Sequence, residues 1–274
     1  MSKNKTDIGR RQFFKTGAIA IGSLAIVGAA SNYLKANKKN NIPDTNTLRP
    51  PGAIDEETFV SECIKCGLCV QICPIQAIKL ADIDAGLDYG TPYIEVRSQA
   101  CDFSCDSLQC VETCPTAVLD FQQFKREGEK AIEKYDKEMA GKQMDKNYNP
   151  FKVQIIAMKE HVKMGVAKLN TSTCLAYQGK GFSGTVRDAG FDGVNRSPYT
   201  TDRKATPVVD KKYSSDICDI CVKECPIGEK AIVMEVQTDG TKKPKVLDGC
   251  TGCGVCVMVC PTEEPSIIVE PIKA

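Results

Sequence analysis

The sequence predicts an α+β protein built from two tandem modules, in which short helices and β-hairpins surround groups of cysteine side chains. Two observations lead to this prediction. The chain of 274 residues contains 16 cysteines, and four groups of them end in the same pattern, Cys-Val-x-x-Cys-Pro. Branched apolar residues, typical of a short strand, follow each group. Four copies of one unit indicate an internal repeat rather than four unrelated motifs.

Two of the groups, at 63–74 and 250–261, have regular spacing. Each has three cysteines at every third position and a fourth four residues later, with proline behind it. This is the spacing with which bacterial ferredoxins hold [4Fe–4S] clusters. A disulfide framework rarely needs cysteines so close together, and zinc does not explain the third cysteine. No Cys-x-x-Cys is followed by His, which excludes covalent haem attachment.

The other two groups are less regular. The group at 101–115 has longer first loops, which still reach a cluster because each added residue spans up to ~3.5 Å. The group at 218–226 has only three cysteines, and Cys174, far upstream, is the one left to complete it. Alternatively, Cys174 is a free thiol, and this site holds a [3Fe–4S] cluster or none. The even division of 16 cysteines into four sets of four favours Cys174 as a ligand.

In the crossed arrangement of bacterial ferredoxins, the fourth cysteine of each group serves the other cluster of its pair. The first predicted set is Cys63, Cys66, Cys69 and Cys114. The second is Cys101, Cys105, Cys110 and Cys73. The third is Cys174, Cys218, Cys221 and Cys260. The fourth is Cys250, Cys253, Cys256 and Cys225. The sequence therefore predicts four [4Fe–4S] clusters.

The first 31 residues resemble a twin-arginine export signal. Arg10 and Arg11 precede Phe13-Phe14-Lys15, and an apolar stretch of 14 residues follows at 17–30. That stretch is short for a membrane span, which needs about 20 residues. Clusters held by thiolates must be assembled before an oxidising compartment is reached, and the twin-arginine route exports folded proteins. We expect a periplasmic protein. A basic amphipathic tail, or an uncleaved anchor that associates the protein with the membrane, is the alternative.

The rest of the chain divides by composition. The charged stretch at 122–148, which is rich in Lys, Glu and Gln, is expected to form a solvated helix that joins the modules, in preference to a docking helix. His161, distant in sequence from the cysteine groups, is expected on the surface. The predicted segments are a linker at 32–58, a first module at 59–121, a helical connector at 122–170, and a second module at 171–274 with a surface insert at 180–213.

Two hairpins are expected beside the cysteine groups. In the first module, the alternating residues 93–96 are expected to pair with 78–80. In the second, 231–236 is expected to turn back at Asp239-Gly240 and pair with 245–247.

The composition also narrows the function. Lys plus Arg is 36 against 35 for Asp plus Glu, so no field of one sign suggests nucleic acid as a partner. No nucleophile–base pair or open metal position is visible, and a cluster with four cysteine ligands leaves no place for substrate. The sequence predicts an electron-transfer component without a small-molecule substrate, not an enzyme. A disulfide-rich secreted binding protein is the alternative from another class.

Several motifs resemble the MauM/NapG family of ferredoxin-type proteins, and most of all its NapG branch. They are the twin-arginine leader, Leu48-Arg-Pro-Pro-Gly-Ala-Ile54, Cys63-x2-Cys66-Gly67, Gly90-Thr-Pro-Tyr93, Cys174-Leu-x-Tyr-Gln-Gly179 and Asp219-x-Cys221-x3-Cys225-Pro226. The chain departs from the family in the long stretch before Cys218 and in a longer charged connector.

The resemblance implies a role in electron transfer from the quinol pool. The implied donor is a membrane polyferredoxin quinol dehydrogenase of the NapH type, and the implied acceptor is a periplasmic nitrate reductase or its cytochrome. The alternative is the iron–sulfur subunit of another exported oxidoreductase, in a methylamine-utilisation or molybdoenzyme system.

Overall fold

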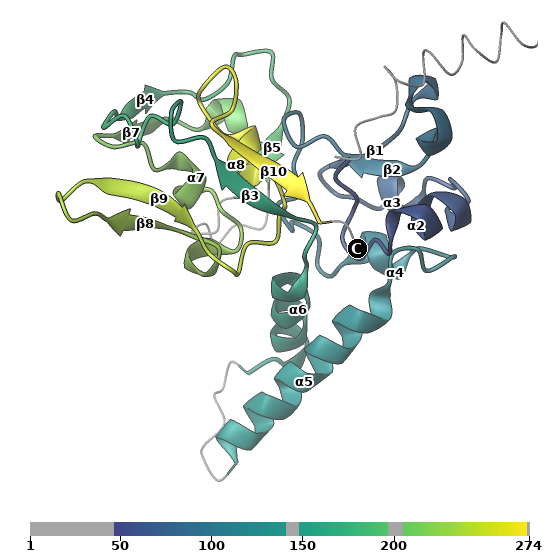
Figure 1. Ribbon diagram of the computed structural model, residues 1–274. Coiled ribbons are helices and arrows are strands. Elements are labelled where there is room, and N and C mark those ends of the chain that lie inside the picture. Colours follow the sequence, from purple (N-terminus) through teal and green to yellow (C-terminus); the bar gives the residue numbers. More distant parts are fainter. Residues whose placement is uncertain (1–46, 141–147, 197–204, 273–274) are drawn as a thin grey trace, which may run out of the picture. The chain divides into compact units, whose positions relative to one another are not determined.

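The computed structural model in Figure 1 describes residues 47–140, 148–196 and 205–272. Outside 84–86, the described residues belong to one compact unit, made of short helices and two-stranded antiparallel sheets. This arrangement confirms the predicted α+β class. The predicted export signal and most of the predicted linker lie outside the described residues. In the part that the structure describes, no helix is both long and apolar enough to cross a membrane.

The first half of the chain contains short elements around a hairpin. They are α2 (Glu56–Glu62), α3 (Leu68–Gln71), β1 (Ile78–Leu80), the 3-10 helix η1 (Ile83–Asp88), β2 (Pro92–Ile94) and α4 (Gln109–Glu112). Strands β1 and β2 pair antiparallel, with Ile78 opposite Ile94, and both of these side chains are buried. The predicted pairing of 78–80 with 93–96 is confirmed for residues 93 and 94, but the strand begins at Pro92 and ends at Ile94.

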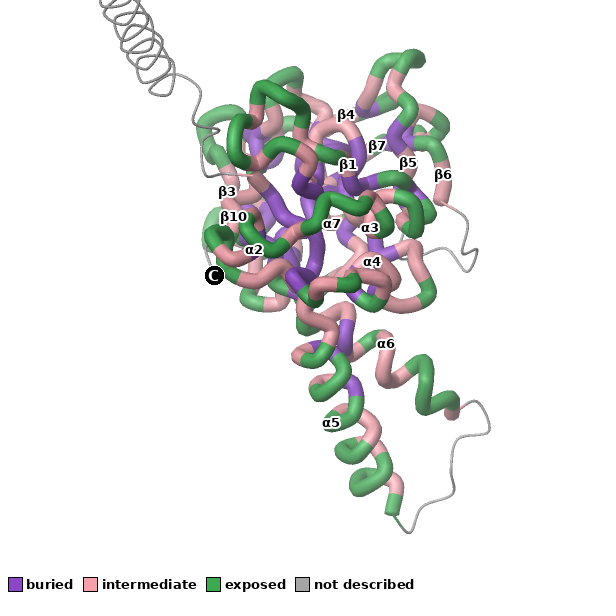
Figure 2. Tube along the Cα trace, turned by 90° about the vertical axis from the view of Figure 1, so that its right-hand side faces the viewer, coloured by how far each residue is buried: buried purple, intermediate pink, exposed green. Residues whose placement is uncertain are grey.

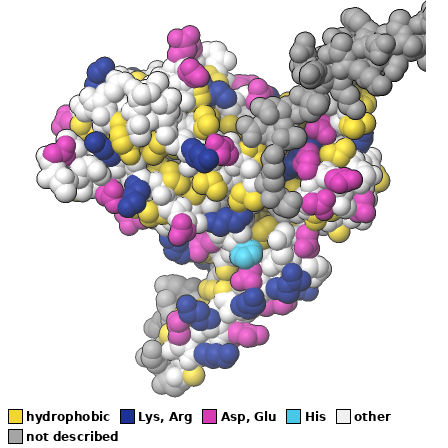
Figure 3. All heavy atoms as spheres, viewed as in Figure 1, with side chains coloured by type: hydrophobic (Ala, Val, Ile, Leu, Met, Phe, Trp, Pro, Cys, Tyr) yellow, Lys and Arg dark blue, Asp and Glu magenta, His cyan; other side chains and the backbone are white. Residues whose placement is uncertain are grey.

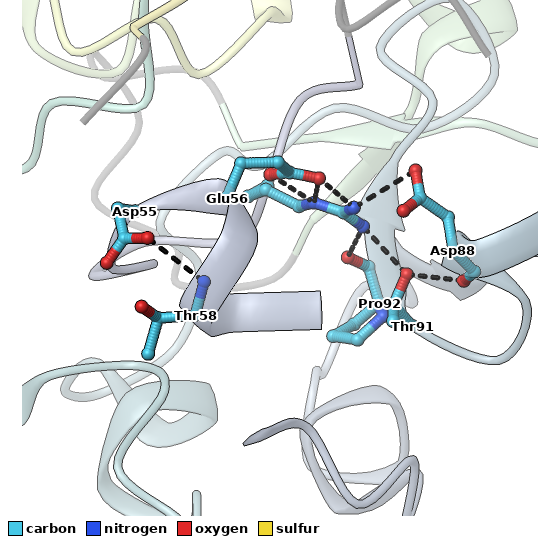
Figure 4. A network of polar contacts seen from close by, with 7 residues as sticks. Asp55, Glu56, Thr58, Asp88, Thr91 and Pro92 are labelled. Carbon is cyan, nitrogen blue, oxygen red and sulfur yellow. Dashed lines mark hydrogen bonds and ion pairs between the residues drawn. The ribbon is translucent and has the colours of Figure 1, made fainter. Parts of the chain in front are cut away.

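The end of the predicted linker is part of this half of the fold. Arg49 is only 7% exposed, and its guanidinium donates to Thr91 Oγ1 at 2.9 Å (Figure 4). It also pairs with the carboxylates of Glu56 and Asp88. The prediction of a linker up to residue 58 is therefore wrong for its last part. The buried cation and its partners fix this segment against α2 and the loop before β2.

A helical hairpin connects the two halves. Helix α5 (Phe121–Met139) begins at Asp120, whose carboxylate accepts a hydrogen bond from the Gln122 amide, and α6 is Pro150–His161. The two helices lie side by side in Figures 1 and 2, and a Cβ added at Gly128 would meet Gln154 Cγ at 2.5 Å. Most of α5 is exposed, as expected for a charged helix, and His161 is also exposed.

The second half contains the remaining elements. They are β3 (Gly165–Leu169), β4 (Phe182–Gly184), β5 (Val194–Asn195), β6 (Thr206–Pro207), η2 (Val208–Asp210), β7 (Tyr213–Ser215), α7 (Ile220–Lys223), η3 (Gly228–Lys230), β8 (Ile232–Val236), β9 (Lys242–Val246), α8 (Val255–Met258) and β10 (Ile267–Pro271). The predicted hairpin is confirmed: β8 pairs antiparallel with β9, and Ile232 faces Val246.

Strand β3 corrects the predicted extent of the connector. The prediction of a helical connector at 122–170 is wrong for residues 165–169, which pair antiparallel with β10 near the end of the chain. Buried and exposed residues alternate through Gly165-Val166-Ala167-Lys168, which is the period of a strand and not of a helix. The connector therefore ends with α6, and β3 already belongs to the second half.

The segment 180–213 was predicted to be a surface insert, and this prediction is also wrong in part. Val208 is fully buried, and Val186 is nearly so. Strand β4 pairs with β7 and β5 pairs with β6, so the described parts of the segment carry two small sheets. The segment is rich in Gly and Ser, so its composition did not indicate that a few apolar side chains pack it against the core.

One core extends through both halves. Phe59 and Leu119 from the first half belong to the same cluster of buried side chains as Ile220 and Val255 from the second. Figure 2 shows buried residues concentrated between the short helices, while α5 is largely exposed. The cysteine groups lie around this core, so the two modules are packed together rather than joined only by the connector.

Candidate iron–sulfur sites

The structure gathers the cysteines into four sets, which we number as sites 1 to 4. Site 1 is a hollow of about 370 Å³ lined by Cys63, Cys66, Cys69 and Cys114. The first three come from the loop before α3 and from α3 itself, and the fourth follows α4. Gly67, at the start of α3, has a φ of 74°, a left-handed conformation that glycine adopts without strain. This turn lets the loop wrap around the hollow.

Site 2 consists of Cys101, Cys105, Cys110 and Cys73. Burial raises the pKa of the Cys110 thiol, and the nearby Cys105 and Cys73 raise it further. Cys105 and Cys110 likewise add to the effect of burial on the pKa of Cys101. The longer loops of this group therefore still bring its cysteines close to one another.

Site 3 is a hollow of about 360 Å³ lined by Cys174, Cys218, Cys221 and Cys260. The structure thus brings the distant Cys174 to the irregular third group. Strand β4 pairs with β7, and the Cys218 amide donates to the Lys180 carbonyl at 3.0 Å. These bonds close the long excursion at its base, so Cys174 and Cys218 lie near each other despite their separation in sequence.

Site 4 is a hollow of about 360 Å³ lined by Cys225, Cys250, Cys253 and Cys256. Its loop turns through Gly254, which begins α8 with a φ of 85°, as Gly67 does at site 1. Sites 1 and 4 are therefore built in the same way, as the equal spacing of their cysteines predicts.

The four short helices α3, α4, α7 and α8 connect the sites in pairs. Cys69 lies in α3 and lines site 1, whereas Cys73, just beyond the same helix, belongs to site 2. In the same way, Cys256 in α8 lines site 4, and Cys260 after it lines site 3. The sets that converge in the structure are thus the crossed sets expected from the sequence.

The chemistry of the cysteines fits a cationic metal cluster. Burial raises the pKa of the Cys69 thiol to about 11, and the neighbouring Cys63 and Cys66 contribute to the rise. Burial, aided by Cys225, raises the pKa of Cys253 to about 12. Four crowded thiolates are therefore unfavourable by themselves, and the positive charge of bound iron would stabilise them. None of the 16 cysteines, all of which lie among the described residues, forms a disulfide, and this argues against the disulfide alternative.

Backbone amides also point at sulfur atoms of the sites. The Ala77 amide donates to Cys73 Sγ at 3.3 Å, and the Ser266 amide donates to Cys260 Sγ at 3.4 Å. Such hydrogen bonds stabilise electron-rich sulfur and help to set the reduction potential of a cluster. Among the described residues, no three His, Cys, Asp or Glu side chains converge as they would around a single metal ion.

Two lysines, one in the last turn of α6 and one just beyond the helix, contact the cysteine loops, and no sequence pattern predicts these contacts. Lys159 Nζ donates to the Phe103 carbonyl at 2.9 Å and to the Cys105 carbonyl in site 2. Lys163 Nζ donates to the Cys250 carbonyl in site 4 at 2.9 Å. Lys159 is partly buried, whereas Lys163 is exposed. Only the packing of α6 against both halves reveals these contacts, because the lysines are far from the loops in sequence.

The comparison with known families agrees with this geometry. Residues 62–118 match the 4Fe-4S dicluster domain, and residues 244–263 match the 4Fe-4S binding domain. The ferredoxin-type protein NapG of Escherichia coli (strain K12) is 30% identical over 257 residues, which are 91% of this chain and 80% of that protein. The chain belongs to the NapG and MauM family of ferredoxin-type proteins.

Other members of the family match over similar lengths. The methylamine utilization ferredoxin-type protein MauM of Methylorubrum extorquens is 29% identical over 259 residues, covering 92% of this chain and 84% of that protein. MauM of Paracoccus denitrificans is 31% identical over 231 residues, covering 82% and 86%. No solved structure matches the chain. Like its family, the chain is an electron-transfer iron–sulfur protein that binds [4Fe–4S] clusters.

Proposed function

We propose that this chain holds four [4Fe–4S] clusters, one in each of sites 1 to 4. The observation that carries this proposal is the convergence of the 16 cysteines into four sets of four. Each set supplies the four thiolates that a [4Fe–4S] cluster requires. Cys174 is included as a ligand because it lines site 3 together with Cys218, Cys221 and Cys260.

A cubane of this kind, when bound, takes up and releases one electron at a time without changing its ligands. The chain would hold the cubanes, shield them in part from water and tune them through amide-to-sulfur hydrogen bonds such as that from Ala77 to Cys73. Charged residues of both signs are interspersed over the face in Figure 3, with no large field of one sign. We therefore propose redox proteins as its partners, and no nucleic acid or small-molecule substrate.

We further propose that the protein works in the periplasm, after export in folded form by the twin-arginine route. The support is the Arg10-Arg11 leader and the need to insert clusters before export. Its proposed donor is a membrane polyferredoxin quinol dehydrogenase of the NapH type. Its proposed acceptor is a periplasmic nitrate reductase or its cytochrome. This direction rests on the resemblance of the chain to the NapG branch.

A second candidate is a role in methylamine utilisation. It is favoured by relatives named MauM, whose identity to this chain, 29% to 31%, is about the same as that of NapG at 30%. The two candidates share the same clusters and differ only in the partner proteins. Identity alone therefore does not separate them.

Anaerobic purification followed by iron and sulfide analysis tests the cofactor proposal. We expect about 16 iron and about 16 sulfide per chain, since each of four clusters brings four of each. About 12 iron would show that one site is empty, and an iron-free chain would overturn the proposal.

The partner proposal needs a separate test. Membranes that contain the NapH-type protein should reduce the purified protein with quinol, and the reduced protein should be reoxidised by the periplasmic nitrate reductase and nitrate. Electron exchange with components of methylamine oxidation instead would support the second candidate. No exchange with either system would refute both assignments while leaving the cluster count intact.

A further inference from the structure

Within each half of the chain, two short helices tie the paired sites together. Cys69 and Cys73 are four residues apart, or roughly 6 Å along a helix axis, and they serve sites 1 and 2. Cys221 and Cys225 have the same relation to sites 3 and 4. Sites 1 and 2 are therefore neighbours, and so are sites 3 and 4.

The two halves meet at sites 2 and 4. The backbone amide of Cys101 in site 2 donates a hydrogen bond to the backbone carbonyl of Cys253 in site 4, at 3.2 Å. The preceding amide, that of Ala100, donates to Met258 Sδ at 3.4 Å. A cysteine of one site thus touches a cysteine of the other through the backbone.

The contact is closely packed. A Cβ added at Gly254 would lie 2.2 Å from Val96 Cγ1 and 3.6 Å from Ala100 Cβ, so the loop of site 4 lies directly against the turn after β2 that leads to site 2. Cys253 and Ala100 are buried at this contact. The glycine is needed there both for its φ of 85° and for the space that it leaves.

Arg97, in the first half of the chain, also forms hydrogen bonds to the second half near this junction. Its guanidinium donates to the carbonyls of Val257 and Cys260 at 2.8 and 2.9 Å. It also donates to Thr262 at 2.7 Å and to Glu263 at 3.1 Å. One side chain of the first half therefore holds four carbonyls around the last cysteine group.

We propose that the cysteine sites adjoin in the order 1–2–4–3, so that the junction of Cys101 with Cys253 connects the two halves and sites 1 and 3 form the ends. This order differs from the order along the chain. The proposed order rests on the proposed function, because it assumes that each of the four sites holds a cluster. Its consequence is that electron partners would meet the protein at sites 1 and 3, while sites 2 and 4 relay between them.

Magnetic interaction between reduced clusters tests the order without any partner. Four double variants each remove two cysteines that belong to a single site: Cys63→Ala with Cys66→Ala, Cys101→Ala with Cys105→Ala, Cys174→Ala with Cys218→Ala, and Cys250→Ala with Cys253→Ala. Each is purified anaerobically, analysed for iron, fully reduced and examined by electron paramagnetic resonance.

The variant without site 2 should contain one isolated, slowly relaxing cluster spin, from site 1, beside a coupled pair. The variant without site 4 should also show one isolated spin, from site 3. Removing site 1 or site 3 should leave three coupled spins and none isolated. An isolated spin in the variants without site 1 or site 3, or three coupled spins in the variant without site 2, would overturn the order.

A second pair of variants keeps all 16 cysteines, in case a double variant does not fold. Gly254→Ala places a methyl against Val96, whereas Gly67→Ala is its matched control: φ is also positive, but the nearest atom, of Leu80, is 4.0 Å away. Gly254→Ala should weaken the coupling between sites 2 and 4, and Gly67→Ala should not. Equal coupling in both variants would overturn the junction.

These outcomes are distinct from failure of the proposed function. A low iron count in the unaltered protein would refute the four clusters. A full iron count with the wrong coupling pattern would refute only the order of the sites.

Discussion

Replacing Arg97 with Met is expected to loosen the junction between the two halves. The side chain is half-buried and donates four hydrogen bonds to carbonyls between Val257 and Glu263. Met keeps much of the aliphatic length of the side chain but donates no hydrogen bond. The variant therefore removes the polar contacts while it disturbs packing only a little.

The size of the effect follows from the number and setting of these bonds. A hydrogen bond that involves a charged group contributes about 1.5–3 kcal/mol, and such contributions are not additive. Water can reach part of this site, because Arg97 is not fully buried, and would replace some of the lost donors. We expect a total loss of about 3 kcal/mol, which corresponds to about 100-fold in an equilibrium or rate constant.

The assay is the rate at which the visible absorbance of the clusters bleaches in denaturant under anaerobic conditions. Cluster loss makes unfolding irreversible, so a rate is the meaningful measure of stability. If the Arg97 contacts break before the transition state, bleaching should be about 10- to 100-fold faster in Arg97→Met. Arg97→Lys, which retains a charge but not the fork of donors, should be intermediate.

The control is Arg126→Met, which removes an exposed arginine from α5 and should leave the rate within a factor of two. Bleaching of Arg97→Met at the rate of this control would refute the reasoning. It would mean that the four carbonyls are satisfied by water at no cost and that the junction does not depend on the guanidinium.

Three further predictions concern single side chains near the sites. Cys174→Ala should lower the iron content by about four of about 16 atoms, and unchanged iron would show that Cys174 is not a ligand. Lys159→Met should lower the reduction potential of site 2, because it removes a partly buried cation from the Cys105 loop. A tenfold change in the one-electron equilibrium corresponds to a shift of about 59 mV. The exposed Lys163→Met should have a smaller effect at site 4, and redox titrations that give equal shifts would contradict this. Lys211→Met should destabilise the fold by about 3–5 kcal/mol by leaving buried Glu224 without its cation. Adding Glu224→Gln should restore part of this loss, and bleaching rates that do not recover in the double variant would argue against a buried pair.

Much of the site was predictable because its ligands carry a local pattern. The three-residue spacing at 63–69 and 250–256 follows from wrapping one loop around one cluster, and the sets found together in the structure are those expected. The place of Cys174 was inferred only by counting. The β4–β7 pairing brings Cys174 to site 3, and it pairs residues such as Phe182 and Ser215. The sequence around these residues has no alternating pattern that would predict the pairing.

The contacts between the halves were not predictable in the same way. Arg97 and Lys159 act on backbone carbonyls, and a carbonyl acceptor leaves no mark on the sequence of the partner segment. Val208 is buried within a stretch whose composition is that of a surface loop. Strand β3 was missed because its pattern is short and its partner lies at the end of the chain. Tertiary packing, rather than local preference, determines these features.

The exchange of cysteines through α3, α4, α7 and α8 bears on how the protein matures. Because each short helix places one cysteine in each of two sites, a cluster inserted in one site orients a ligand for its neighbour. We expect clusters to be inserted cooperatively in pairs, so that substoichiometric iron yields chains with two or four clusters more often than one or three. Native mass spectrometry during reconstitution would show this distribution. Chains with a half-filled pair, which hold one or three clusters, would then be an unstable minority, and this favours completion of each pair in the compartment where iron and sulfide are supplied.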